Sequence, residues 1–239
     1  MFYLKFGLSK QVVVYLHGWG ADKNSFLWVK PYFEKFTNVF VDFPGFGDSK
    51  EPDKSWNVES YAKELKNLID EIDVEELVLV GHSFGGRVAI KFAKLYQKEY
   101  LKLKICLVDS AGLKPKRGLS YYFKVWRYKI LKSKSIRNPE LKNKLCKFGS
   151  EDYKLLSPTM KQVFVNVVNE NLKFDAKQIC VPTILIWGEN DNDTKLCMAK
   201  KLNKLIKNSK LYVLKDAGHF SFLDKPQEFL IILDRFLQN

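Results

Sequence analysis

A serine between glycines is the residue whose setting points most directly to chemistry. Residues 81–85 (GHSFG) fit the pattern G-x-S-x-G, directly after the apolar run 77–80 (LVLV) and before a helical pattern over 85–96. Glycines on both sides permit a sharp turn that projects the Ser83 hydroxyl from the strand, at a helix start where N–H groups face a developing negative charge. The pattern therefore predicts that Ser83 is a nucleophile.

A serine hydroxyl needs a base to take its proton, and the chain has three histidines. His82 precedes Ser83 on the same turn, so we expect it to point to the opposite side. His17 lies in the first strand-exit loop, where we expect it to hold the loop by hydrogen bonds. His219 follows the apolar run 211–214 (LYVL), and open α/β sheets place reactive side chains at such strand ends. We predict that His219 is the base.

The imidazole in turn needs a carboxylate that fixes its tautomer and stabilises the imidazolium. Asp191 follows the run 183–187 (TILIW) and lies between Ser83 and His219 in the chain. The order Ser, Asp, His is that of one known triad class. Asp193 and Asp109 are the alternatives, with loop capping and a structural hydrogen bond as their competing interpretations. Asp191 is the predicted acid.

Acyl-transfer chemistry also needs two N–H donors for a tetrahedral oxyanion. The backbone of Phe84, directly after the nucleophile, is expected to supply one. The loop 17–20 (HGWG) is expected to supply the other from Trp19, although a plain tight turn is the competing interpretation. The side chains of Trp19 and Phe84 would then line the acyl pocket. This machinery requires no metal and no organic cofactor.

Short apolar runs alternate with helical patterns along most of the chain. The runs are 11–16, 38–42, 77–80, 105–108, 183–187 and 211–214, and the helical patterns are 58–72, 85–96, 194–206 and 227–237. Continuous apolar runs suit strands buried on both faces, and strand alternating with helix indicates a parallel sheet with helices on both sides. We predict an α/β fold, with residues 2–6 as an added edge strand.

The alternation breaks once, after Asp109. The gap of about seventy residues before the next strand is too long for a structureless loop in a compact domain. Ser157 and Pro158 have the types of an N-cap and a first helical residue. Two apolar stripes follow helical spacing: Leu119, Tyr122, Phe123, Trp126 and Ile130, and Met160, Val163, Phe164, Val167 and Val168. We predict a helical cap over 113–175, inserted in a core formed by 1–112 and 176–239.

The composition is that of a folded protein. Of the 239 residues 46% are hydrophobic and 28% charged, which excludes a disordered chain and a disulfide scaffold. No run is long and apolar enough to span a membrane, and residues 1–10 lack the features of a signal peptide, so a cytoplasmic protein is expected. Cys106, Cys146, Cys180 and Cys197 are far apart, which predicts reduced, mostly buried thiols and no metal site.

The net charge of +13 is concentrated in one segment. From Leu113 to Lys177 there are 16 basic and 5 acidic residues. We hypothesise that this segment forms a positive rim that favours a small-molecule acyl substrate that is anionic or carried on an acidic protein, with Lys124, Arg127 and Lys132 as the residues to test. The competing interpretation is a solvated helical face. A non-catalytic binder of nucleic acid or a membrane surface is the alternative, although no nucleic-acid partner is expected.

Further motifs add a family resemblance. With residues 41–49 (VDFPGFGDS), which look like a D-x-P-G-x-G-x-S loop, the sequence resembles the α/β-hydrolase family over nearly its whole length. The resemblance implies that family's fold and a Ser-Asp-His triad. It leaves the substrate open, because the family includes carboxylesterases, carbon–carbon bond hydrolases, aminopeptidases and a menaquinone-pathway lyase.

Within the family, two segments resemble different branches. Residues 17–20 with 41–49 look most like the esterases of pimeloyl-carrier-protein methyl ester, whereas residues 83–87 (SFGGR) look equally like the lyase. Aspartate replaces the serine in haloalkane dehalogenases and epoxide hydrolases, which disfavours both. The leading hypothesis is a serine hydrolase that cleaves a carboxylic ester through an acyl-enzyme on Ser83. A carbon–carbon bond hydrolase or the lyase is the alternative.

Overall fold

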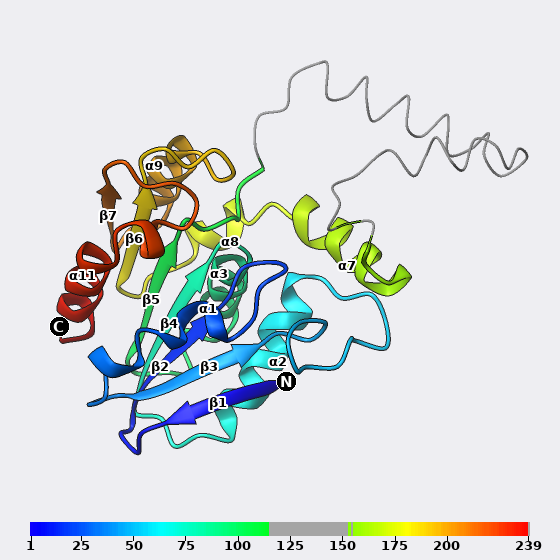
Figure 1. The fold of residues 1–239 in the computed structure, drawn as a ribbon, viewed down its shortest axis with the longest axis horizontal. Coiled ribbons are helices and arrows are strands. Elements are labelled where there is room, and N and C mark those ends of the chain that lie inside the picture. Colours follow the sequence, from blue (N-terminus) through cyan, green and yellow to red (C-terminus); the bar gives the residue numbers. More distant parts are fainter. Residues whose placement is uncertain (115–152, 154, 239) are drawn as a thin grey trace, which may run out of the picture.

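A seven-stranded sheet forms the centre of the computed structural model, which describes residues 1–114, 153 and 155–238 (Figure 1). The strands are β1 (Phe2–Phe6), β2 (Gln11–Leu16), β3 (Thr37–Asp42), β4 (Glu76–His82), β5 (Leu103–Val108), β6 (Thr183–Gly188) and β7 (Ser209–Leu214). Their order is β1-β3-β2-β4-β5-β6-β7, with β1 antiparallel to β3 and the other pairs parallel. The predicted α/β class and the added edge strand are confirmed.

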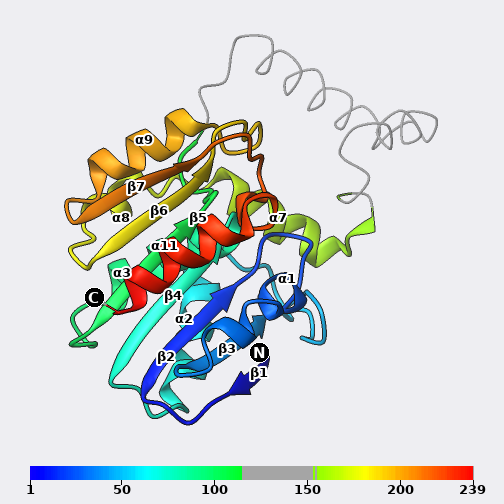
Figure 2. The same ribbon diagram turned by 60° about the vertical axis from the view of Figure 1, so that its left-hand side comes forward.

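Helices cover both faces of this sheet, and Figure 2 shows α11 crossing in front of it with α2 and α3 behind. One face packs against α2 (Val58–Asp70), α3 (Phe84–Tyr96), α8 (Lys173–Lys177) and α9 (Leu196–Leu205), and α7 (Pro158–Asn169) joins the same hydrophobic cluster. The other packs against α1 (Asn24–Leu27), the 3-10 helix η1 (Lys30–Tyr32), α10 (Ser221–Asp224) and α11 (Pro226–Gln238). Because helices lie on both sides, the central strands β3, β4 and β6 are buried along their whole length.

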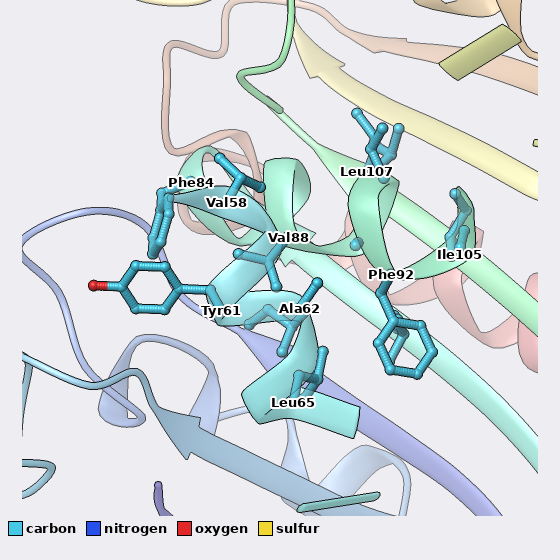
Figure 3. Packing of buried hydrophobic residues seen from close by; sticks show 14 of the residues in the cluster. Val58, Tyr61, Ala62, Leu65, Phe84, Val88, Phe92, Ile105 and Leu107 are labelled. Atoms are coloured by element: carbon cyan, nitrogen blue, oxygen red, sulfur yellow. The ribbon is translucent and has the colours of Figure 1, made fainter. Parts of the chain in front are cut away.

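The helix after the predicted nucleophile is fixed by dense packing. Phe84, at the start of α3, meets Tyr61 of α2 with ring centroids 5.0 Å apart, and Val88 one turn later lies in the same cluster (Figure 3). The hydroxyl of Tyr61 donates a hydrogen bond to the carbonyl of Pro44. These contacts give the turn before α3 a rigid support.

Only part of the predicted cap falls in the described residues. The helix predicted from Ser157 and Pro158 is confirmed as α7, and the Ser157 hydroxyl accepts a hydrogen bond from the Met160 N–H. The stripe from Leu119 to Ile130 lies outside the described residues, as do Lys124, Arg127 and Lys132. The division into core and cap stays a prediction, and its boundary at residue 175 falls inside α8.

The cysteines depart from expectation. Cys106, Cys180 and Cys197 are unpaired, but only Cys106 is buried, so the prediction of mostly buried thiols is wrong for the other two. Cys180 lies in the exposed loop before β6, and Cys197 lies in the first turn of α9, whose buried residues are Ala199 and Leu202. Burial raises the pKa of the Cys106 thiol. Cys146 lies outside the described residues.

Candidate active site

A strained turn between β4 and α3 presents Ser83. Its φ of +48° and ψ of −105° are unusual for a residue with a side chain. The flanking glycines are sterically required: a Cβ on Gly81 would lie 2.6 Å from the Gly85 carbonyl, and one on Gly85 would lie 2.1 Å from the Leu16 carbonyl oxygen. The turn is held by two backbone bonds, because the Ser83 N–H donates to Val108 O at 3.0 Å and the Ala111 N–H donates to Ser83 O at 3.0 Å.

Two further loops bring a base and an acid to this turn. Asp191 follows β6, and His219 lies between β7 and α10. The Nε2 atom of His219 is 3.1 Å from Ser83 Oγ, and its Nδ1 is 2.9 Å from Asp191 Oδ2. The structure therefore brings the three residues predicted as nucleophile, acid and base into one hydrogen-bonded chain, at the carboxyl ends of the parallel strands.

The Asp191 carboxylate has its hydrogen-bonding capacity filled. Oδ1 accepts the backbone N–H groups of Asp193 and Thr194, each at 2.8 Å. Oδ2 lies 2.6 Å from the Thr194 hydroxyl and also accepts from His219. Burial alone would raise the pKa of Asp191, but the bonds from His219 and Thr194 outweigh it and lower that pKa. The acid is thus kept ionised beside the imidazole.

The charge of Asp191 acts on the base in return. Burial alone would lower the pKa of His219, but the hydrogen bond to Asp191 and the negative charge of that carboxylate outweigh it and raise the pKa. An imidazole with a raised pKa holds a proton more firmly once it has taken one. The pair is therefore suited to general-base chemistry on the Ser83 hydroxyl.

The two alternative acids occupy other positions. The side chain of Asp193 is exposed, and its backbone N–H donates a hydrogen bond to Asp191 Oδ1. Asp109, at the end of β5 with φ +43°, accepts the Gly188 N–H at 2.8 Å and both the N–H and the hydroxyl of Ser221, at 3.0 and 2.5 Å. Burial raises the pKa of Asp109 to about 7. Asp109 ties the ends of β5 and β6 to the start of α10, the structural role considered from the sequence.

The other two histidines support the site from the side. The Nδ1–H of His17 donates to Gly18 O at 2.7 Å, and its Nε2 accepts the Phe43 N–H at 3.0 Å, which fixes the loop as expected. His82 does not turn away from the site as expected: its ring centroid lies 5.0 Å from that of His219, and its Nε2–H donates to His219 O at 2.8 Å. Burial lowers the pKa of His82 to about 3, so this support is uncharged.

Sequence reasoning missed Thr194. Its hydroxyl lies 2.6 Å from Asp191 Oδ2 and 2.9 Å from the Asp109 carbonyl oxygen, and its N–H donates to Asp191. The helix predicted from residue 194 begins at Leu196, since Thr194 is engaged in these bonds. A threonine three residues after an aspartate in a strand-exit loop is the one signal that could have indicated it.

The two predicted oxyanion donors come from different parts of the chain: Phe84 directly follows Ser83, whereas Trp19 lies in the loop after β2. Phe84 is the first residue of α3, and Trp19 packs on it with ring centroids 5.5 Å apart. Within the described part of the chain, neither backbone N–H has a hydrogen-bond partner. Among the described residues both N–H groups are thus unengaged, as their predicted role requires.

Aromatic rings form a wall next to this turn. Trp19 lies 4.9 Å from Phe46 and 5.1 Å from Phe164 of α7, and Tyr153 lies 5.5 Å from Phe164, all between ring centroids. The side chain of Phe164 connects α7 with the loop that carries Trp19. These rings make the surface next to the turn apolar.

The arginine of the SFGGR segment has a structural partner. Arg87 is 6% exposed and donates from Nη1 to the carbonyl of Glu170, which follows α7, at 2.9 Å. The Glu170 carboxylate pairs with Lys91 at 2.9 Å and accepts the Val58 N–H at 3.2 Å. Burial lowers the pKa of Arg87 to about 10. This network fastens the end of α7 to α2 and α3.

One described cluster has metal-ligating residue types. Asp191, Asp193 and His219 each place one such atom within 4.8 Å of the others. Both oxygens of Asp191 already accept hydrogen bonds, and the Nδ1 of His219 is engaged with one of them. The cluster is thus explained by the hydrogen-bonded chain described above.

Among the described residues, no helix is long and apolar enough to cross a membrane.

Comparison with known proteins identifies the family. Residues 13–230 match the alpha/beta hydrolase family, so the chain belongs to it and is an enzyme of the hydrolase class. The AB hydrolase superfamily protein YisY of Bacillus subtilis is 24% identical over 94% of this chain and 90% of its own length. Lipase 1 of Psychrobacter immobilis is 24% identical over 92% of this chain and 75% of its own length.

Solved structures agree on the fold. The esterase EaEST of Exiguobacterium antarcticum has a TM-score of 0.76 and 21% identity, covering 100% of this chain and 95% of its own. The meta-cleavage product hydrolase of Pseudomonas fluorescens has a TM-score of 0.72 and 18% identity, covering 99% of this chain and 93% of its own. Identities this low show the fold alone, and the predicted α/β-hydrolase fold is confirmed.

Proposed function

We propose that this protein is a serine hydrolase that cleaves a carboxylic ester through an acyl-enzyme on Ser83. One observation carries the proposal: Ser83 Oγ, on a strained turn, lies 3.1 Å from an imidazole nitrogen of His219, whose other nitrogen lies 2.9 Å from the buried carboxylate of Asp191. A nucleophile in hydrogen-bond reach of a base that a third group orients is the arrangement of covalent acyl transfer.

The first half-reaction forms the acyl-enzyme. His219 Nε2 takes the hydroxyl proton as Ser83 Oγ attacks the ester carbonyl carbon, and Asp191 stabilises the resulting imidazolium. The carbonyl oxygen becomes an oxyanion that accepts hydrogen bonds from the N–H groups of Trp19 and Phe84. The intermediate then collapses, and the C–O bond to the alcohol breaks as His219 returns its proton to the leaving oxygen.

The second half-reaction repeats these steps with water. His219 takes a proton from a water molecule, whose oxygen attacks the acyl carbon. The second intermediate breaks the bond to Ser83 Oγ, which regains the proton from His219, and the carboxylic acid leaves. The aromatic wall of Trp19, Phe46 and Phe164 supports an apolar acyl group, since it offers no charged group to a bound chain.

Labelling by a fluorophosphonate probe tests the nucleophile. We expect the wild-type protein to be labelled once and Ser83→Ala not at all, with turnover of a p-nitrophenyl ester reduced at least about 10³-fold and an unchanged melting temperature. Ser55→Ala, at an exposed loop serine, is the matched control and should label and turn over as the wild type does. An active Ser83→Ala protein would refute the mechanism.

A substrate panel tests the reaction class. We expect p-nitrophenyl esters to be cleaved faster than a ring-cleavage product or a proline naphthylamide. Preference for the ring-cleavage product would establish a carbon–carbon bond hydrolase instead, a candidate because the Pseudomonas fluorescens hydrolase shares the fold. An ester with a carboxylate, or one on an acidic carrier protein, tests the proposed selection by the basic segment 113–177, much of which lies outside the described residues.

A further inference from the structure

Seven exposed lysines lie on and around α9 and β7, the last strand of the sheet. Between Asp193 and Asp216 the chain has seven lysines, no arginine and no acidic residue. The lysines are Lys195, Lys200, Lys201, Lys204, Lys207, Lys210 and Lys215, and all are exposed. We call them the lysine surface. Strand β7 is the last in the sheet, and Figure 2 shows it with α9 at the margin of the molecule.

Within the described residues, the lysine surface lacks the ion pairs that several other lysines make. Lys63 pairs with Glu59, Lys66 with Asp70, and Lys10 with both Asp73 and Glu75. By contrast, none of the seven makes an ion pair with any residue that the structure describes. Seven like charges with no counterion among the described residues repel one another and create a positive potential that reaches about 10 Å at 0.1 M salt. A dense negative surface would relieve that repulsion.

The lysine surface reaches the loops of the candidate active site. Lys195 follows Asp191 by four residues, and Lys215 precedes His219 by four. Large apolar side chains are exposed in β7 and after His219: Val213 of β7, Phe220 and Leu223 of α10 are 39%, 49% and 50% exposed. Lys215 and the exposed Phe220 thus flank the candidate catalytic histidine in the chain.

We propose that the lysine surface docks the protein on an anionic lipid surface. Lysine ammonium groups on flexible stems suit a plane of lipid headgroups, and exposed aromatic and aliphatic side chains suit the layer beneath it. Recognition of nucleic acid by paired hydrogen bonds favours arginine, which is missing from the lysine surface. Docking would bring Ser83 to acyl esters held in the lipid. That consequence rests on the proposed function, whereas the docking does not.

Vesicle binding tests the docking on protein without turnover. The Ser83→Ala protein is sedimented with vesicles of phosphatidylcholine alone or of phosphatidylcholine with about 30 mol% phosphatidylglycerol. We expect binding only with the anionic lipid and weaker binding as salt rises. Each lysine near an anionic surface contributes about a fivefold change in partitioning. The triple reversal K200E/K201E/K204E on α9 should therefore weaken binding at least about 100-fold.

A matched variant separates the lysine surface from net charge. K54E/K98E/K102E reverses three exposed lysines outside the lysine surface and changes the net charge equally, so it should weaken binding less than about fivefold. Equal losses in both triple variants would overturn the proposal, as would equal binding to neutral vesicles or no binding at all. Tighter binding to a single-stranded oligonucleotide than to the anionic vesicles would overturn it in favour of nucleic acid.

Hydrolysis in vesicles connects docking with the site. In the protein that retains Ser83, K200E/K201E/K204E should leave kcat/KM on a soluble p-nitrophenyl ester unchanged. On the same ester embedded in anionic vesicles, the variant's kcat/KM should fall at least about tenfold. Equal rates on the embedded ester would overturn delivery by the lysine surface. If the wild type cleaves no ester while Ser83→Ala still binds vesicles, the proposed function fails and the docking stands.

Discussion

Asp191→Asn would reverse the proton arrangement of the candidate site without changing its shape. The position of Asp191 Oδ1 faces two N–H donors, those of Asp193 and Thr194, each at 2.8 Å, so the amide oxygen of asparagine must take that position. The amide NH₂ then occupies the position of Oδ2. There it can donate to the Thr194 hydroxyl, which in turn donates to the Asp109 carbonyl at 2.9 Å.

An NH₂ group at that position disables the base. Nδ1 of His219, 2.9 Å from Oδ2 in the wild type, would then face a donor and must present its lone pair. The neutral ring therefore carries its proton on Nε2, where it cannot accept a proton from Ser83. We expect kcat to fall by about 10⁴, or about 5.5 kcal/mol of barrier. The melting temperature should change little, because the amide retains the four hydrogen bonds.

Ester turnover and thermal unfolding check this prediction together. kcat on a p-nitrophenyl ester and the melting temperature are measured for Asp191→Asn and for Asp193→Asn. The second variant changes an exposed carboxylate whose backbone N–H is unaffected, so its kcat should stay within about threefold of the wild type. A loss of less than about tenfold in Asp191→Asn, or a comparable loss in Asp193→Asn, would refute the reasoning.

Three further measurements probe His219 and the groups next to the candidate site. Because His219 must be neutral to act and its pKa is raised by Asp191, kcat/KM measured from pH 5 to 9 should rise with a midpoint above about 6.5; a midpoint below that contradicts the raised pKa. Thr194→Val removes a hydroxyl that supports Asp191, so we expect about 1–2 kcal/mol less stability by urea unfolding and about a threefold to tenfold lower kcat; an unchanged kcat argues against the support. The pKa of Asp109 is raised to about 7, so between about pH 4 and 7 the folded state keeps a proton that the unfolded state loses, and this group's contribution to stability falls as pH rises. The melting temperature of the wild type should fall relative to that of Asp109→Asn as the pH rises from about 4.5 to about 7.5. A constant difference between the two melting temperatures would contradict the raised pKa.

The sheet was largely predictable because its strands are buried on both faces. The run 11–16 coincides with β2, and the runs 183–187 and 211–214 lie within β6 and β7. The short helices α1 and α10 were not predicted, since four residues are too few to show a helical period.

The site was predictable where chemistry constrains residue type and not where it depends on packing. Ser83, Asp191 and His219 follow strand ends that a parallel sheet brings to one edge, so their meeting could be inferred. The place of His82 could not be inferred, because its side chain direction depends on the turn and on its bond to the His219 carbonyl. Thr194 was missed for the same reason: its hydroxyl meets Asp109, which lies 85 positions earlier in the chain.

The strained backbone at Ser83 sets two evolutionary pressures against each other. A non-glycine residue at φ +48° and ψ −105° is less stable there by about 1–3 kcal/mol, a sizeable part of the roughly 5–15 kcal/mol that keeps a domain folded. Glycine would relieve this strain and remove the hydroxyl in the same step. Selection for heat resistance alone would therefore favour an inert protein, and only continued demand for the reaction keeps a serine at this turn.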